Sequence, residues 1–149
     1  MEGNVRYISE YLRGAPKLII PVYQRNYDWQ KENCRRLIDD LITLHGEGKK
    51  THFFGSIVVK PGDYSQGIVI IDGQQRITTI SLLILAMKNY MMKNNITYQT
   101  INPYNLNDSF LINSFSNDAD KQKLKPNPRD QCKRAVQSFI YDKRQKDRY

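Results

Sequence analysis

The amino-terminal part of the chain switches between helix-like and strand-like spacing of its apolar residues. The first run follows the spacing of a buried helix face, with Asn4 placed to cap the helix and Gly14 placed to end it. That face consists of Val5, Ile8, Tyr11 and Leu12. Residues 17–22 (KLIIPV) then predict a strand, and Pro21 marks either its edge or its end.

A second helix and a β-hairpin are predicted next. Asp28 can cap a helix that stops at Gly46 and Gly48. The apolar face of this helix carries Leu37, Ile38, Leu41 and Ile42. Residues 53–60 (FFGSIVVK) and 68–71 (IVII) are apolar and rich in β-branched side chains, and the turn-rich segment PGDYSQG separates them. Together they predict a hairpin.

The second strand of this hairpin leads directly into the most apolar helix of the chain. From about Gln74 onward, apolar residues fall on one helical stripe, and Leu82 and Leu85 make the opposite side apolar too. The stripe consists of Ile77, Ile80, Leu83, Ile84, Met87 and Met91. A helix with this distribution is predicted to be central and deeply buried.

The pattern becomes irregular after this helix. Eight asparagines between residues 89 and 117 accompany the loss of any period, which predicts a long, variable Asn-rich loop at residues 94–120. Residues 110–113 and 122–125 could form short strands around it. Pro128 suits the first turn of a last helix, whose apolar residues are Ala135, Val136, Phe139 and Ile140.

The order of these elements predicts a single α+β domain over residues 1–149, in which helices pack against a small mixed sheet. A chain of 149 residues suits one hydrophobic core. Because the last helix stays highly charged and carries no stop signal, we expect a fragment of, or a chain truncated relative to, a longer protein.

The composition predicts a folded cytoplasmic protein. A hydrophobic content of 40% argues against disorder. The longest apolar stretch, residues 80–87, is shorter than the roughly 20 residues that span a bilayer. The start of the chain shows no secretory signal. Cys34 and Cys132 lie far apart without a CxxC motif, so neither a disulfide framework nor a zinc site is indicated.

The net charge of +8 belongs to the carboxyl-terminal tail. Residues 1–120 hold 13 Lys and Arg against 12 Asp and Glu, which gives +1, whereas residues 121–149 hold 10 against 3, which gives +7. Such a run is either a solvated helix face or a surface for a phosphate backbone or an acidic partner.

The residues with the clearest chemistry lie where the hairpin meets the apolar helix. The head of that helix carries Gln74, Gln75, Arg76, Thr78 and Thr79. The first N–H groups of a helix lack internal partners, so this turn can bind an anion. Gly73 lets the backbone approach a phosphate, and Arg76 is a bidentate donor. Asp72 could hold Mg²⁺ or orient a water that either glutamine positions.

Two interpretations of this segment stay open. In the structural one, Asp72-Gly73 is only a turn, Asp72 caps the helix, and Arg76 pairs with a surface carboxylate. The functional one is favoured by the succession of polar residues at the head of an apolar helix. The phosphate-binding signature GxxxxGK[ST] is absent, so a nucleotide site would have to be built in another way.

Two further motifs are candidates for ligand contacts. In IPVYQRNYDW (residues 20–29) the polar pair Gln24 and Arg25 sits among the aromatic residues Tyr23, Tyr27 and Trp29. Rings beside a guanidinium can stack a nucleobase, or they can pack in a core. In HFFGSIVV (residues 52–59) Gly55 interrupts a strand, which indicates a bulge or a close ligand, with Phe54 and Ser56 beside it.

These three motifs, in this order and spacing, resemble the N-terminal domain of GmrSD-type modification-dependent restriction enzymes and related phage-defence proteins. The later segment KLKPNPRDQCKRAVQSFI is similar to the stretch after the variable loop of that family. The resemblance covers nearly the whole chain.

The resemblance implies a ParB- and sulfiredoxin-like fold that binds and hydrolyses a nucleoside triphosphate through the DGQQR motif, here residues 72–76. Gln24 and Arg25 would then form the partner motif across the site. A nuclease domain or subunit would lie elsewhere, because no HNH-type pattern occurs in this chain.

Three functions follow as alternatives. The first is a regulatory nucleotide-binding module that could form a homo-oligomer. The second is a DNA-contacting module without catalysis, which would use the basic tail. The third is an inactive remnant that has lost the helices completing its site.

Overall fold

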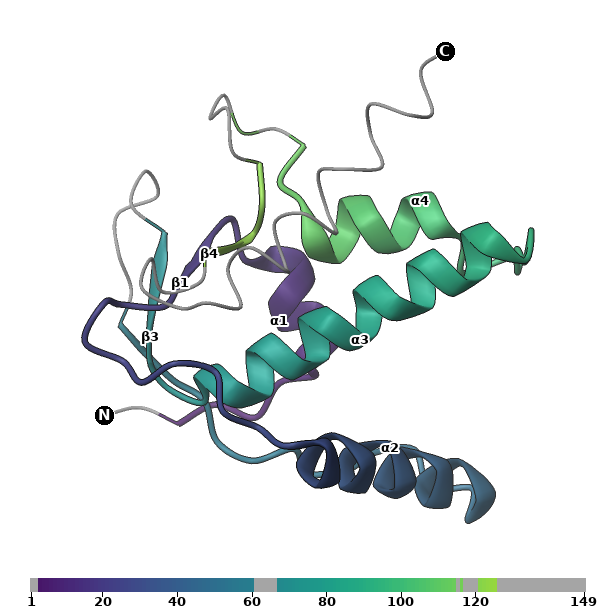
Figure 1. The fold of residues 1–149 in the computed structure, drawn as a ribbon, viewed down its shortest axis with the longest axis horizontal. Helices are drawn as coiled ribbons and strands as arrows, with labels where there is room; N and C mark the ends of the chain where they lie inside the picture. The colour runs from purple at the N-terminus through teal and green to yellow at the C-terminus, as the bar shows by residue number, and fades with distance from the viewer. Residues whose placement is uncertain (1–2, 61–66, 115, 117–120, 126–149) are drawn as a thin grey trace.

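The computed structural model describes residues 3–60, 67–114, 116 and 121–125 (Figure 1). The helices are α1 (Ile8–Gly14), α2 (Lys31–Gly46), α3 (Gln74–Lys93), α4 (Pro103–Leu106) and the π-helix η1 (Asn107–Leu111). The strands are β1 (Leu18–Ile19), β2 (Val58–Lys60), β3 (Ile68–Asp72) and β4 (Leu124–Lys125). The predicted last helix, Cys132 and most of the basic tail lie outside the described residues.

The strands form one mixed sheet in the order β2-β3-β1-β4. In the parallel pairs, Leu18 of β1 lies opposite Ile68 of β3 and opposite Leu124 of β4. β2 and β3 are antiparallel, as the predicted hairpin requires. Helices packed on a mixed sheet confirm the α+β class.

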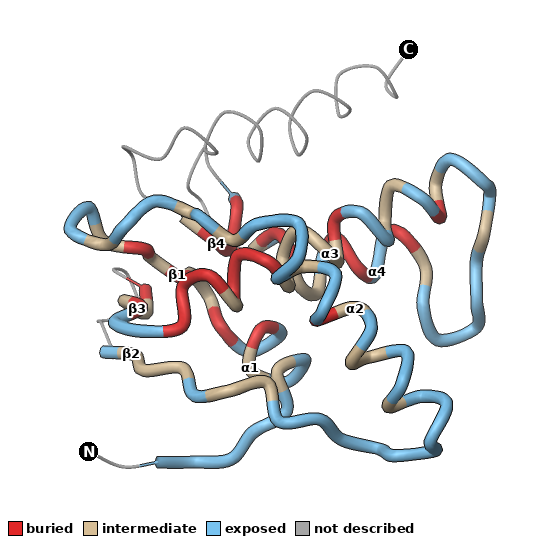
Figure 2. Tube along the Cα trace, turned by 60° about the horizontal axis from the view of Figure 1, so that its bottom comes forward, coloured by how far each residue is buried: buried red, intermediate tan, exposed pale blue. Residues whose placement is uncertain are grey.

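The core lies where α1, the sheet and the first half of α3 meet (Figure 2). Leu18, Ile70 and Ile77 are its most deeply buried large side chains, and they come from β1, β3 and α3. The same cluster contains Leu12, Ala15, Ile20 and Leu124. Each buried aliphatic side chain contributes roughly 1.5–3 kcal/mol to the free energy of folding. Side-chain packing therefore stabilises the strands β1 and β4, which have only two residues each and form few hydrogen bonds with their neighbours.

The predicted apolar helix is confirmed as α3, but its burial is uneven. Ile77 is fully buried, whereas Met87 and Tyr90 near the far end are exposed. Within the part of the chain that the structure describes, α3 packs beside α4 and η1 (Figure 1). No helix among the described residues is both long and apolar enough to cross a membrane.

The Asn-rich segment after α3 is more ordered than its sequence predicts. Asn102 caps α4 by accepting a hydrogen bond from the N–H of Asn105 at 2.8 Å, and Pro103 occupies the first turn. Leu106 and Leu111 are buried. The prediction of an irregular loop is therefore wrong for residues 103–111. Helical structure forms there without a periodic apolar pattern, because the Asn102 cap and the burial of Leu106 and Leu111 stabilise it.

Both predicted helix caps are wrong. The amino-terminal cap of α1 is Tyr7, since Asn4 and Val5 lie in an exposed segment without regular structure before it. The cap of α2 is Gln30, whose N–H donates to the Asn33 side chain at 2.9 Å. Asp28 instead binds Gln75 through its N–H and Arg25 through its carboxylate. The predicted helix ends at Gly14 and Gly46 are confirmed.

The strands are shorter than their apolar runs predict. β1 covers two residues of the predicted 17–22, and the chain turns at Pro21, whose carbonyl accepts from Gln24 N–H at 3.0 Å. β2 begins only at Val58 because Gly55 has a φ of 101°, outside the extended region. The strand expected at residues 110–113 is reduced to one bridge between Ile112 and Gln122.

Lys123 connects three elements from inside the protein. It is only 7% exposed, and its Nζ donates to the carbonyls of Leu12, Arg13 and Ser109 at 3.0, 2.9 and 2.8 Å. Burial lowers the pKa of Lys123, and the charge of Arg13 lowers it further. The three acceptors offset part of this desolvation and join α1, η1 and the segment before β4.

Replacing Lys123 should test this connection. We expect Lys123→Met to lower the free energy of unfolding by about 2–3 kcal/mol, because the carbonyls around it lose a charged donor. Lys121→Met is the matched control, since Lys121 is exposed. Urea unfolding of both variants measures the difference, and equal stability of the two would contradict the connecting role.

Candidate functional site

The three sequence motifs meet at the junction between β3 and α3. The loop after β1 runs past the amino-terminal end of α3, as the dark blue trace shows in Figure 1. The segment before β2 reaches the same end, since its Ser56 carbonyl accepts a hydrogen bond from Arg76. Residues distant in sequence therefore converge at the head of one helix.

Two glutamine side chains fasten the loop after β1 to this helix. Gln74 Nε2 donates to the carbonyl of Arg25 at 2.7 Å, and Gln75 Nε2 donates to that of Asn26 at 3.0 Å. Gln75 also accepts, through Oε1, from the N–H of Asp28 at 3.1 Å. Both glutamines are buried. Their amides are thus engaged with backbone, so the loop cannot shift without leaving buried polar groups unsatisfied.

Other polar contacts extend the attachment on both sides. Gln24 Nε2 donates to the carbonyl of Ile71, the residue before Asp72, at 2.7 Å. The Tyr27 hydroxyl lies 3.0 Å from Thr79 Oγ1 and 3.5 Å from Cys34 Sγ. Tyr27 is therefore tied to α3 by its polar end, which fixes its ring between the loop and the helix.

Arg76 lies against a glycine. Its Nη1 donates to the Ser56 carbonyl at 2.8 Å. A Cβ on Gly55 would lie 2.9 Å from Arg76 Nε and 3.0 Å from Cζ, so the Arg76 side chain would have to shift to admit it. No ion pair of the described residues involves Arg76. A guanidinium has five N–H groups, so most of its donors stay available to an anion.

The start of α3 is buried, yet its first backbone N–H groups have no acceptor among the described residues. Gly73 is the cap residue with a φ of 92°, and a Cβ there would approach Ile57 and the Ser56 carbonyl within 3.3 Å. In the described part of the chain, no acceptor receives the backbone N–H of Gln74, Gln75 or Arg76. These N–H groups lie at the positive end of a 20-residue helix.

The structural interpretation of Asp72 and Arg76 is wrong in two respects. Asp72 does not cap α3, since Gly73 does, and the Asp72 side chain is exposed at the end of β3. Arg76 does not pair with a carboxylate among the described residues. No group of three or more His, Cys, Asp or Glu side chains in the described ranges could hold a metal ion.

The remaining candidates differ in their exposure. Tyr23 is 71% exposed, while Trp29 and Phe54 are half-buried. Thr78 is buried and belongs to a different place, the hollow beside α3. Sequence reasoning missed the exposed Phe53, as well as the backbone groups of Asn26 and Asp28 that bind Gln75. No sequence signal marks a backbone acceptor, but the two adjacent aromatics of HFFG could have identified Phe53.

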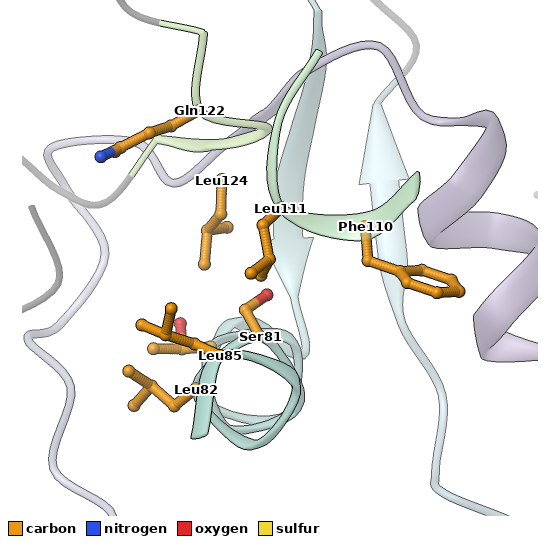
Figure 3. A pocket seen from close by; sticks show the side chains of 8 residues that line it. Ser81, Leu82, Leu85, Phe110, Leu111, Gln122 and Leu124 are labelled. Carbon is orange, nitrogen blue, oxygen red and sulfur yellow. The ribbon is translucent and has the colours of Figure 1, made fainter. Parts of the chain in front are cut away.

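A hollow lies beside α3, between that helix, η1 and β4 (Figure 3). Leucine side chains dominate its lining, with Phe110 at one side and Gln122 at the rim. Among its lining residues none is charged, so it offers no partner for a triphosphate. The β3–α3 junction carries the charged donors and therefore remains the candidate site.

Comparison with known proteins identifies the family. The model of the GmrSD restriction endonuclease N-terminal domain matches residues 6–148. The chain belongs to the GmrSD N-terminal domain family. This domain is a component of a restriction, or phage-defence, system. A search of curated proteins found no significant match. The resemblance drawn from the three motifs is confirmed, and in this GmrSD N-terminal domain those motifs also meet in space.

The attachment by Gln75 can be tested with an isosteric change. In Gln75→Glu a carboxylate replaces the donor that faces the Asn26 carbonyl, so we expect a loss of about 1–3 kcal/mol of stability. Hydrogen exchange of residues 24–29 should become faster. Gln99→Glu, at an exposed position, is the control. Unchanged exchange in Gln75→Glu would show that the loop is held by other contacts.

The backbone conformation at Gly55 predicts a requirement for glycine. Gly55→Ala should destabilise the domain by about 1–3 kcal/mol, because an alanine is strained at a φ of 101° and its Cβ would also displace the Arg76 side chain. Gly46→Ala is the control, since nothing lies within 4 Å of a Cβ there. Thermal unfolding compares them, and a loss in Gly55→Ala no larger than in the control would contradict the requirement for glycine.

Proposed function

We propose that the β3–α3 junction of this GmrSD N-terminal domain binds and hydrolyses a nucleoside triphosphate, and that nucleotide state controls a nuclease part of the restriction system. The observation that carries the proposal is the Arg76 guanidinium, which lies against Gly55 at the first turn of α3 and lacks a carboxylate partner among the described residues. A polyphosphate needs this combination of a fixed bidentate cation and backbone donors.

In this proposal the backbone and Arg76 contact the phosphates directly. The N–H groups of residues 74–76 would donate to one phosphoryl group, and Gly73 adds no side chain of its own at the cap. Arg25 would contact the phosphates from the attached loop, where its side chain is 69% exposed. Two guanidinium groups on different segments suit a chain of linked phosphates.

The glutamines of DGQQR receive a revised role. The sequence predicts that Gln74 or Gln75 positions a water, yet both side-chain amides are buried and bound to the loop backbone. We infer that they position Arg25 and its neighbours instead. Water activation then falls to Asp72, which is exposed at the end of β3, directly before the cap of α3.

A magnesium ion fits Asp72 only together with the ligand. Mg²⁺ prefers carboxylate, water and phosphate oxygens in an octahedral arrangement. The described residues provide no cluster of three carboxylate, His or Cys groups, so the remaining ligands would be phosphate oxygens and waters. The ion would supply charge neutralisation between the β- and γ-phosphates.

The exposed aromatics suit the base or the sugar. Tyr23 is 71% exposed and precedes Gln24, which is bonded to the residue before Asp72. Trp29 and Phe54 are half-buried at the two flanking segments. Tyr27 is less suited, because its hydroxyl already contacts Thr79. A ring with a free face offers stacking that tolerates different bases.

The alternative of DNA contact through the basic tail has little support in the described residues. Lys123, one of the tail cations, is buried against three carbonyls and cannot reach a phosphate backbone. The other predicted tail contacts lie mostly outside the described residues.

A thermal-shift panel of the four ribonucleoside triphosphates with Mg²⁺ tests the proposal. Binding to the folded state raises the unfolding temperature, so at least one triphosphate should stabilise the wild-type protein. Arg76→Ala should abolish this shift and the calorimetric binding signal. Arg35→Ala, an exposed arginine of α2, should retain both. Equal affinity in Arg76→Ala and wild type would refute the assigned role.

A further inference from the structure

The loop that carries Arg25 also carries a carboxylate bound to it. Arg25 Nη1 donates to Asp28 Oδ2 at 3.2 Å, and the two side chains are 69% and 53% exposed. The sequence predicts Asp28 as the cap of α2, a role that Gln30 fills. The Asp28 side chain is therefore not needed to cap α2.

We propose that Asp28 is a specificity-determining residue, which competes with the phosphates of a ligand for Arg25. This inference rests on the proposed function, because it takes Arg25 as a phosphate contact. A ligand must displace the Asp28 carboxylate from the guanidinium before a phosphate can occupy the same donors. Asp28 thereby weakens most a ligand whose phosphate reaches Arg25 alone.

The first turn of α3 anchors the backbone of both residues of this ion pair. Gln74 binds the carbonyl of Arg25 at 2.7 Å, and Gln75 binds the N–H of Asp28 at 3.1 Å. An ion pair three residues apart in a free loop would sample many arrangements. Here both backbones are anchored to the first turn of one helix, so the two side chains stay within reach of each other.

The charge balance at the junction makes the competition selective. Two arginines, Arg25 and Arg76, stand against two carboxylates, Asp28 and Asp72, so these four side chains carry no net charge. A single phosphate that displaces Asp28 from Arg25 only exchanges one ion pair of the guanidinium for another, so little binding energy is gained. A ligand with several linked phosphates can engage Arg76 and the helix N–H groups at the same time, and this offsets the loss.

Calorimetric titration of the full 149-residue chain with inorganic tripolyphosphate, without Mg²⁺ and at low ionic strength, tests the inference. Asp28→Asn should bind about two- to fivefold more tightly than wild type, the range expected for releasing an exposed ion pair. Asp39→Asn is the matched control. Asp39 is 63% exposed and pairs with Arg35 on α2 at 3.9 Å, and its replacement should leave the affinity unchanged.

A double-mutant cycle separates competition from general repulsion. In an Arg25→Gln background, Asp28→Asn should give no further gain, because the guanidinium for which it competes is gone. A gain of the same size in that background would overturn the inference. Asp28→Ser, which also removes the charge, should reproduce the effect of Asp28→Asn and guards against a folding artefact of one variant.

The failures are distinguishable. Binding by wild type with equal or weaker binding by Asp28→Asn would overturn the role of Asp28 and leave the proposed function intact. Absence of binding by wild type and by both Asp28 variants would overturn the proposed function and this inference together. Binding that appears only on removal of the Asp28 charge would support the competition.

Discussion

The site depends on two buried amides at the head of α3. Gln74 and Gln75 lie below the loop after β1 and bind its backbone, one by a single hydrogen bond and the other by a donor and an acceptor. Burial makes each of these bonds costly to break, since an unsatisfied amide loses its hydration without replacement. Because the bonds use loop backbone, the side chains of Tyr23, Arg25 and Asp28 remain exposed to solvent.

A second constraint acts on the same end of the helix. Gly55 and Gly73 allow the segment before β2 to lie against Arg76 and against the start of α3, at distances where a Cβ would force the neighbouring atoms to shift. The Ser56 carbonyl then orients the guanidinium without neutralising it. This explains why three separate motifs belong together, because each one fixes the position of another at the same helix end.

The junction rests directly on the hydrophobic core. Ile70 of β3 and Ile77 of α3 are fully buried on either side of the exposed Asp72 and the glycine cap. The strand and the helix that carry the site are thereby held by packing, which limits motion at the turn between them. The apolar hollow and the Lys123 connection lie at α3, η1 and β4, where they organise the rest of the domain.

Local patterns in the sequence determined the elements with strong periods or unambiguous turns. The apolar helix, the hairpin, the α+β class and the family motifs followed from spacing that is encoded within short segments. The caps at Tyr7 and Gln30, the helix within the Asn-rich segment and the truncated strands were decided by tertiary contacts. The same holds for the site, where sequence identified Gln75 and Arg76 as polar residues at a helix start. Only the folded chain decided that one binds the Asn26 and Asp28 backbone and the other lies on Gly55, because the partners of a hydrogen bond between distant segments are set by packing of the whole domain.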